Sequence, residues 1–250
     1  MGSRLKFINL IINKIISNPR SDRMFPIVSV TWNPVSGCPH NCKYCWARRL
    51  AETKLRHTPR YRRGFIPRMN FKALRRRFKR DEIVFVSDMG DLFADGIPEE
   101  WIFRVLRYIE RRPEAYFLFL TKNPSRYHEF LEHFPENAIL GATIETNKDG
   151  LYAKHRISRA PLPSKRYMAM KELEWDLKFV SIEPILEFDL DEMVKWVEDI
   201  DPVLVFVGYD NWNNKLPEPR YYDTLKLIDR LEYITIVIRK SIRRAWWEVA

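Results

Sequence analysis

The sequence of 250 residues lacks features that are typical of membrane and secreted proteins. It has only three cysteines and no hydrophobic run of membrane-spanning length. The longest apolar stretch near its start, from Leu5 to Ile16, is interrupted by two lysines and two asparagines, whereas a transmembrane helix needs about 20 apolar residues. The stretch also lacks the continuous apolar core and the cleavage site of a signal peptide. We therefore expect an amphipathic N-terminal helix in a cytoplasmic protein without a membrane partner.

The low counts of other residue types exclude further classes of protein. Only 8 glycines and 16 prolines occur, which excludes a fibrous or low-complexity chain. Because 46% of the residues are hydrophobic and 14% are aromatic, the chain is too apolar to be disordered. Glutamine is absent, while isoleucine, glutamate, lysine and arginine are abundant, a bias found in thermophile proteins. The composition thus predicts a globular protein and indicates a thermophile.

Positive charge is concentrated in one part of the chain. The formal net charge is +10, yet the segment from Lys43 to Arg80 holds 15 basic residues against one acid and sums to +14, so the other 212 residues sum to −4. We call residues 48–80 the basic insertion. Its charges alternate with aromatic side chains, a combination typical of surfaces that bind phosphates and unpaired bases, although a solvent-exposed helix gives the same pattern. The arginines that we assign to nucleic-acid contact are Arg62, Arg63, Arg75, Arg76 and Arg77.

Short runs of β-branched and aromatic residues alternate with helical patterns along the chain, which is typical of parallel β/α units. The predicted strands are 27–31, 83–86, 116–120, 139–143, 178–182, 203–207 and 234–238, and the predicted helices between them include 98–111, 124–134, 190–199 and 220–231. The expected α/β fold is a single partial (β/α)6-type or near-complete parallel β/α barrel with an N-terminal helix. We expect a helical extension at 1–24 and a barrel domain at 25–250 that includes the basic insertion.

Polar residues follow the predicted strands. In parallel α/β folds the carboxyl ends of the strands form the ligand-binding face, so these residues are candidates for one shared site, although each could instead cap the next helix. The candidates are Ser87, Asp88, Gly90 and Asp91 after the second strand, Lys122 after the third, Glu145 after the fourth and Glu183 after the fifth.

All three cysteines lie in one C-x3-C-x2-C arrangement, Cys38, Cys42 and Cys45, directly after the first predicted strand. Three thiols cannot all pair in one chain, and a cytosolic protein has little use for a disulfide. A structural zinc ion would need a fourth ligand such as His40 or His57. A cubane iron–sulfur cluster held by three cysteines is also chemically sensible, because one iron stays open for an exogenous ligand.

This motif, with the aromatic Tyr44 before its last cysteine, resembles the radical S-adenosylmethionine (radical SAM) superfamily. Four further stretches resemble the phage-associated three-Cys-motif branch of that superfamily: 31–38, 86–93, 120–124 and 180–184. The segment that starts at Gly208 departs from the Gly/Ser-rich turn of that branch, and the first-strand loop is shorter. The resemblance implies a [4Fe–4S] cluster on the three cysteines that binds S-adenosylmethionine (SAM) and cleaves it reductively to a 5′-deoxyadenosyl radical.

The resemblance also implies roles for the residues at the strand ends. Tyr44 would lie by the adenine of SAM, and the segment 87–91 would receive its methionyl ammonium, with Asp88 or Asp91 as a counter-charge. Lys122 is suited to a carboxylate, and Glu145 and Glu183 are suited to ribose hydroxyls or to the substrate. No residue is assigned to catalysis on the substrate itself.

Three functional hypotheses follow. The first is a radical SAM enzyme that modifies a nucleic acid held by the basic insertion. The second is a radical SAM enzyme that acts on a small molecule or a protein, in which the basic insertion docks an acidic partner such as a ferredoxin or flavodoxin reductase. The third is a non-enzymatic zinc-binding nucleic-acid module, which metal analysis would distinguish from the other two.

Overall fold

The computed structural model describes residues 2–17 and 25–248. The expected extension at 1–24 and the expected barrel domain at 25–250 therefore include positions outside the described residues, namely 1, 18–24 and 249–250. The division of the chain between these two parts stays a prediction. Among the described residues, no helix combines the length and the hydrophobicity that crossing a membrane requires.

All seven predicted strands are present and form one parallel sheet. Their order in the sheet follows the chain: β1 (Val30–Trp32), β4 (Ile83–Val86), β5 (Tyr116–Thr121), β6 (Ala138–Thr143), β7 (Lys178–Ile182), β8 (Leu204–Val207) and β9 (Ile236–Arg239). The sheet curls but does not close, because β1 and β9 are edge strands that do not pair with each other. The fold is thus a half-barrel, the partial form of the expected barrel. Two short strands, β2 (Val35–Ser36) and β3 (Arg68–Met69), form a separate antiparallel pair.

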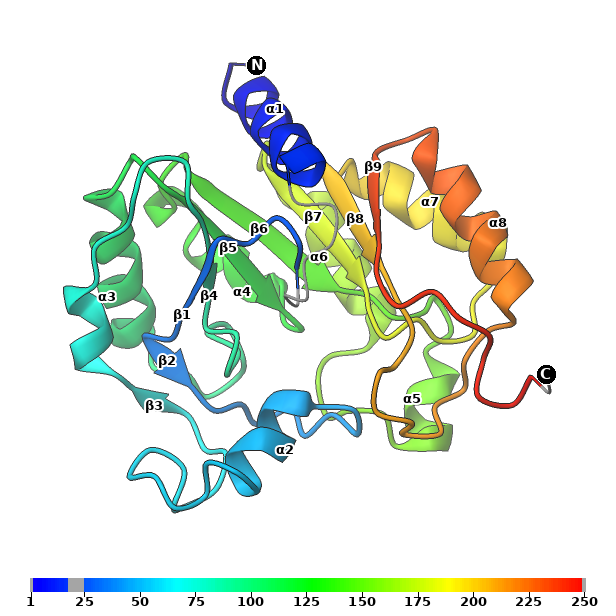
Figure 1. Ribbon diagram of the computed structural model, residues 1–250, viewed down its shortest axis with the longest axis horizontal. Coiled ribbons are helices and arrows are strands. Elements are labelled where there is room, and N and C mark those ends of the chain that lie inside the picture. The colour runs from blue at the N-terminus through cyan, green and yellow to red at the C-terminus, as the bar shows by residue number, and fades with distance from the viewer. Residues whose placement is uncertain (1, 18–24, 249–250) are drawn as a thin grey trace.

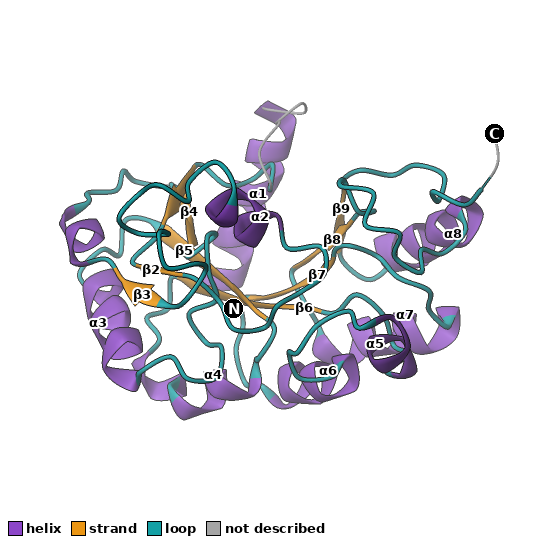
Figure 2. Ribbon diagram, turned by 90° about the horizontal axis from the view of Figure 1, so that it is seen from below, coloured by secondary structure: helices purple, strands orange, loops and turns teal. Residues whose placement is uncertain are grey.

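The helices cover the convex face of the sheet (Figure 2). They are α3 (Glu99–Glu110), α4 (Ser125–Glu129), α6 (Pro163–Glu172), α7 (Leu190–Ile200) and α8 (Tyr221–Glu232), with the short α2 (Trp46–Glu52) and α5 (Gly150–His155) on the loops beyond the strands. The predicted helix 124–134 is wrong as one element, because Phe130 leaves helical geometry at φ −120°. Its ring is buried in the outer core, and a separate 3-10 turn, η2 (Leu131–His133), follows it.

Side chains of each strand alternate between two hydrophobic cores, as the pleat requires. In β4, Val84 and Val86 pack toward the outer helices, whereas Ile83 and Phe85 pack on the concave face. The predicted amphipathic helix is α1 (Gly2–Ser17), whose fully buried Phe7 belongs to that concave core. The described residues therefore cover the sheet on both faces near its amino ends.

Candidate functional site

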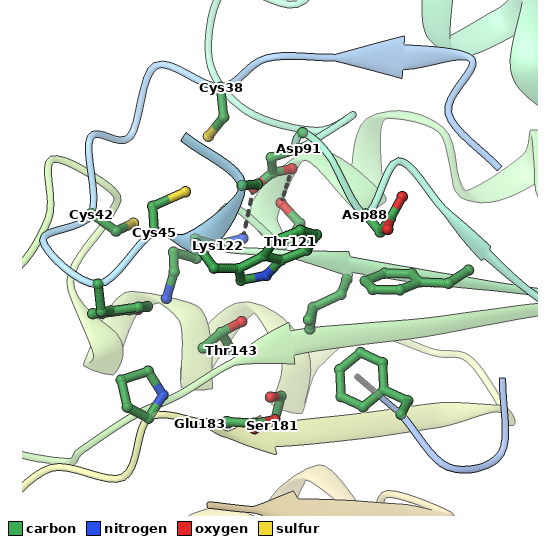
Figure 3. A pocket seen from close by; sticks show the side chains of 18 of the residues that line it. Cys38, Cys42, Cys45, Asp88, Asp91, Thr121, Lys122, Thr143, Ser181 and Glu183 are labelled. Atoms are coloured by element: carbon green, nitrogen blue, oxygen red, sulfur yellow. Dashed lines mark hydrogen bonds between the residues drawn. The ribbon is translucent and has the colours of Figure 1, made fainter. Parts of the chain in front are cut away.

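A cavity of about 730 Å³ opens at the carboxyl ends of the strands. This volume falls in the range of small-molecule and cofactor sites, about 300–1,000 Å³. The residues of the sequence-predicted site that line it are Cys38, Cys42, Tyr44, Cys45, Asp88, Gly90, Asp91, Lys122 and Glu183. Figure 3 shows the labelled side chains of the cysteine loop, of the turn after β4 and of the ends of β5 and β7 around one pocket. Ser87 and Glu145 are not among the lining residues.

Two glycines let the cysteine loop, residues 38–45, run close to the turn after β4. Gly37 has a φ of +89°, and a Cβ there would lie 2.1 Å from the carbonyl oxygen of Ile66. A Cβ on Gly90 would lie 2.9 Å from the carbonyl oxygen of Gly37, with which Gly90 forms a β-bridge. Only glycine fits such a close backbone approach, so Gly90 shapes the site through its packing.

The three cysteine sulfurs face the cavity from this loop, each half-buried. Cys45 also caps α2, because its sulfur accepts a hydrogen bond from the Arg48 backbone N–H at 3.3 Å. Among the described residues, Cys38, His40 and Asp91 form a group whose ligand atoms all lie within 4.8 Å of one another, but the three sulfurs do not form such a group. The site thus brings a cysteine, a histidine and an aspartate close together, and the other two cysteines line the same cavity.

Cys38 and Cys45 also need a cation to exist as thiolates at neutral pH. Burial, and next the carboxylate of Asp91, raise the pKa of the Cys38 thiol well above its usual value. Burial likewise raises the pKa of Cys45. Metal ligation requires the thiolate form, so the positive charge of the bound iron would have to supply the missing stabilisation. The site thus suits a strongly bound metal group and does not suit a free nucleophilic thiol.

Asp91 is a structural anchor for the cysteine loop. His40, inside that loop, bonds one Asp91 carboxylate oxygen through Nε2 at 3.0 Å, and Thr121 donates to the other at 2.8 Å. The backbone N–H groups of Lys122 and Phe93 also donate to this carboxylate, at 3.0 Å each. Burial raises the pKa of Asp91, but these hydrogen bonds, led by that of His40, outweigh it and lower the pKa. The sequence analysis considered His40 only as a zinc ligand.

The turn after β4 holds two further candidates. Ser87 has a φ of +60°, and its buried hydroxyl has no hydrogen-bond partner among the described residues. Asp88 accepts a hydrogen bond of 2.5 Å from the Asn33 side-chain amide, whose oxygen in turn accepts from the Met89 N–H at 2.9 Å. Burial raises the pKa of Asp88. This turn therefore presents one carboxylate to the cavity on a backbone fixed by Asn33.

Glu145 lies beneath the cavity in a saturated network. Its side chain is fully buried, and one oxygen accepts from Tyr44 and from Lys122, while the other accepts from Tyr152 at 2.8 Å and from Arg166 at 2.6 Å. Burial favours the protonated form, but Arg166 and Lys122 outweigh it and hold the pKa of Glu145 well below its usual range. No lone pair is left for a ribose hydroxyl, and we conclude that Glu145 positions its neighbours.

Two of these neighbours do reach the cavity. The Lys122 ammonium lies 5.1 Å from the centre of the Tyr44 ring and hydrogen-bonds Glu145 beneath it. An ammonium has three donors, so Lys122 can also donate to a ligand. Arg166, on α6, was missed by the sequence analysis, and no strand-end or motif signal could have found it, because it comes from the middle of a helix.

Glu183 is far less satisfied than Glu145. One of its carboxylate oxygens, Oε2, is buried and has no hydrogen-bond partner in the part of the chain that the structure describes, and the other lies 3.5 Å from the ammonium of Lys240. Burial raises the pKa of Glu183 and lowers the pKa of Lys240. Lys240 directly follows β9, so the same strand-end argument, applied to the last predicted strand, could have identified it.

The segment after β8 forms another wall. Tyr209, Asp210, Asn211 and Trp212 all line the cavity. Trp212 is 53% exposed, and the Arg49 guanidinium lies 5.1 Å from its ring. This contact joins α2 of the basic insertion to the segment after β8 across the mouth of the cavity. These residues occupy the position at which the sequence departs from the Gly/Ser-rich turn of the resembled branch.

The five arginines assigned to nucleic-acid contact do not form one helical face and do not line the cavity. Arg62 and Arg63 lie in turns beyond α2. Arg75 ends the 3-10 helix η1 (Phe71–Arg75), and Arg76 donates to the Thr31 carbonyl oxygen at 2.8 Å, at the edge strand β1. The basic insertion thus surrounds one side of the half-barrel from α2 to α3 (Figure 1).

A family profile matches residues 26–208, which include the cysteine loop and the ends of six strands of the half-barrel. The chain belongs to the DUF5131 family. Its members are described as proteins of unknown function. Kinship with the phage-associated branch stays a prediction. A search of curated proteins found no match.

Solved structures of spore photoproduct lyase share the fold. A cysteine-to-serine mutant aligns with a TM-score of 0.55 at 13% identity, over 86% of this chain and 64% of the lyase. Another mutant, with bound AdoMet and dinucleoside spore photoproduct, aligns with a TM-score of 0.53 at 11% identity. This alignment covers 80% of this chain and 60% of the lyase. A lyase complexed with dinucleoside spore photoproduct aligns with a TM-score of 0.50 at 13% identity. This alignment covers 69% of this chain and 53% of the lyase. The chain therefore spans less than two thirds of these lyase chains, and the likeness concerns the fold.

Proposed function

We propose that this protein is a radical SAM enzyme. The observation that carries the proposal is the position of Cys38, Cys42 and Cys45, which line the cavity at the carboxyl ends of a parallel half-barrel from one C-x3-C-x2-C loop. These cysteines would hold a [4Fe–4S] cluster with one open iron. The fold of a lyase that has been solved with AdoMet bound supports the assignment. When bound, the cluster and SAM supply a 5′-deoxyadenosyl radical.

The residues around the cysteines bind and orient this cofactor pair. Asp91 holds the cysteine loop in place through His40. Lys122 offers its ammonium to the SAM carboxylate, Asp88 offers a counter-charge to the methionyl ammonium, and the Tyr44 ring offers a face to the adenine; all three line the cavity. Glu145 keeps Tyr44 and Lys122 in position from below.

A nucleic acid is the substrate that we propose. Trp212, exposed at the mouth of the cavity with Arg49 over its ring, offers a stacking surface to an unpaired base, and such stacking contributes about 1–3 kcal/mol per base. The basic insertion would attract the phosphate backbone. Two of the similar lyase structures hold a dinucleoside photoproduct. A small-molecule or protein substrate has no comparable surface in its favour.

The electron donor that we propose is an acidic ferredoxin or flavodoxin. Docking of this donor is the alternative role of the basic insertion, whose assigned arginines lie outside the cavity. The cytoplasmic location and the thermophilic source remain predictions from the composition.

The decisive experiment is anaerobic purification, reconstitution with iron and sulfide, and incubation with dithionite and SAM. We expect 5′-deoxyadenosine as a product, quantified by chromatography, and we expect it to disappear when Cys38, Cys42 and Cys45 are all replaced by Ala. His57→Ala serves as the matched control, because His57 does not line the cavity, and it should leave the yield unchanged. A protein that holds zinc and no acid-labile sulfide, and that forms no 5′-deoxyadenosine, would contradict the proposal and favour the zinc module.

A further inference from the structure

The pair of Glu183 and Lys240 has hydrogen-bonding capacity that the protein does not use. Glu183 Oε2 is buried and has no partner among the described residues, although it belongs to a residue that lines the cavity. Lys240 also lines the cavity, with its ammonium 3.5 Å from Glu183 Oε1 and 5.1 Å from the centre of the Phe25 ring. A buried polar atom without a partner is destabilising, so its presence in a folded protein calls for an explanation such as a bound group.

The charges of the pair define the chemistry of its ligand. A phosphate or carboxylate would be attracted by Lys240 but repelled by the adjoining Glu183. A cation would be attracted by Glu183 but repelled by Lys240. A neutral group with an N–H donor beside an acceptor satisfies both residues. The edges of nucleobases have this arrangement, and Phe25, Val28 and Phe85 supply apolar cavity walls against which a planar ring can lie.

Gly208 packs closely against this pair. A Cβ at this position, directly after β8, would lie 2.9 Å from Lys240 Cβ and 3.3 Å from Glu183 Oε1. Any side chain here would therefore push against both members of the pair. Glycine at this point lets Glu183 and Lys240 keep their positions beside the cavity.

We propose that Glu183 and Lys240 form a nucleobase-binding subsite in the cavity, with Glu183 Oε2 accepting from an N–H of the base and Lys240 donating to its neighbouring acceptor. This inference rests on the proposed function, because two sources of such a base are then present: the adenine of SAM and an unpaired base of the nucleic-acid substrate. The subsite gives the base-recognising contacts that Trp212 stacking alone does not provide.

The test is isothermal titration calorimetry on the reconstituted protein with two separate probes, S-adenosylhomocysteine and a mixed-sequence single-stranded hexanucleotide. The variant Glu183→Gln with Lys240→Met removes both charges and keeps the side-chain volumes, and Gly208→Ala displaces the two side chains but removes neither charge. Lys195→Met, on the exposed face of α7, is the matched control. Thermal unfolding of each variant establishes that it is folded.

We expect the double variant and Gly208→Ala to weaken one probe at least ten-fold and to leave the other within two-fold. Weaker hexanucleotide binding assigns the subsite to the substrate, and weaker S-adenosylhomocysteine binding assigns it to the cofactor. Unchanged affinity for both probes, no binding of either probe by the wild type, or displacement of the affected probe by inorganic phosphate overturns the subsite. Cleavage of SAM by the wild-type protein is measured separately, so the failure of the proposed function is recognised independently.

Discussion

Glu145 and Glu183 each follow a parallel strand by two or fewer residues, yet they differ in almost every physical respect. Glu145 accepts hydrogen bonds from four side chains, two of them cationic, and is fully buried. Glu183 has one distant ammonium and one oxygen without a partner. The same residue type at equivalent positions can therefore belong to the framework of a site or to its ligand-binding surface. The number of donors around the carboxylate distinguishes the two roles.

The largest expected effect comes from removing the charge of Glu145. Glu145→Gln leaves Arg166 and Lys122 without their carboxylate, and breaking a buried ion pair in this way costs about 3–5 kcal/mol. Unfolding by guanidinium should show a loss of that size. The matched variant Glu183→Gln should lose less than about 1 kcal/mol, because burial already favours the neutral form of that residue. Equal losses in the two variants would show that the comparison is wrong.

The two glutamates should also respond differently to pH. The folded-state pKa of Glu145 is depressed, so its stabilisation is present above its unfolded pKa of about 4.3 and is lost as the pH falls below that value. The stability gap between the wild type and Glu145→Gln should therefore narrow as the pH falls below about 4. The folded-state pKa of Glu183 is raised. The stability that its neutral form contributes is therefore present at low pH and is lost as the pH rises through the folded-state pKa. Guanidinium unfolding of the wild type and of each Gln variant at several pH values checks both signs. A stability difference between the wild type and Glu145→Gln that grows in acid contradicts the first sign, and a wild type that loses stability relative to Glu183→Gln in acid contradicts the second.

A smaller effect is expected on the open side of the cavity. Trp212→Ala removes a stacking face worth about 1–3 kcal/mol and should weaken binding of a single-stranded oligonucleotide by roughly 5- to 150-fold, measured by fluorescence anisotropy. Stability should stay close to that of the wild type, since the side chain is half exposed. Tyr233→Ala is the control, because Tyr233 is the more exposed of the two, at 86%. An equal loss of affinity in both variants would remove Trp212 from the proposed interface.

Most of the sheet was predictable because each strand is a short apolar run covered on both faces. The predicted helix 124–134 failed because burial of Phe130 in the outer core outweighed local helical preference. The helices α5 and α6 had no prediction, although α6 contributes the buried Arg166. A hydrophobic pattern does not show a buried arginine, since its partners come from distant parts of the chain.

The sequence by itself determined the number of parallel strands, the three metal-ligating candidates and the polar residues at the strand ends, because each of these depends on local composition and spacing. Only the tertiary structure decided that the half-barrel stays open, that the charge of the basic insertion lies outside the cavity, and that Glu145 is saturated while Glu183 is not. Hydrogen-bond satisfaction depends on which side chains the fold brings together. Lys240 meets Glu183, and Arg166 meets Glu145, only once the chain has folded.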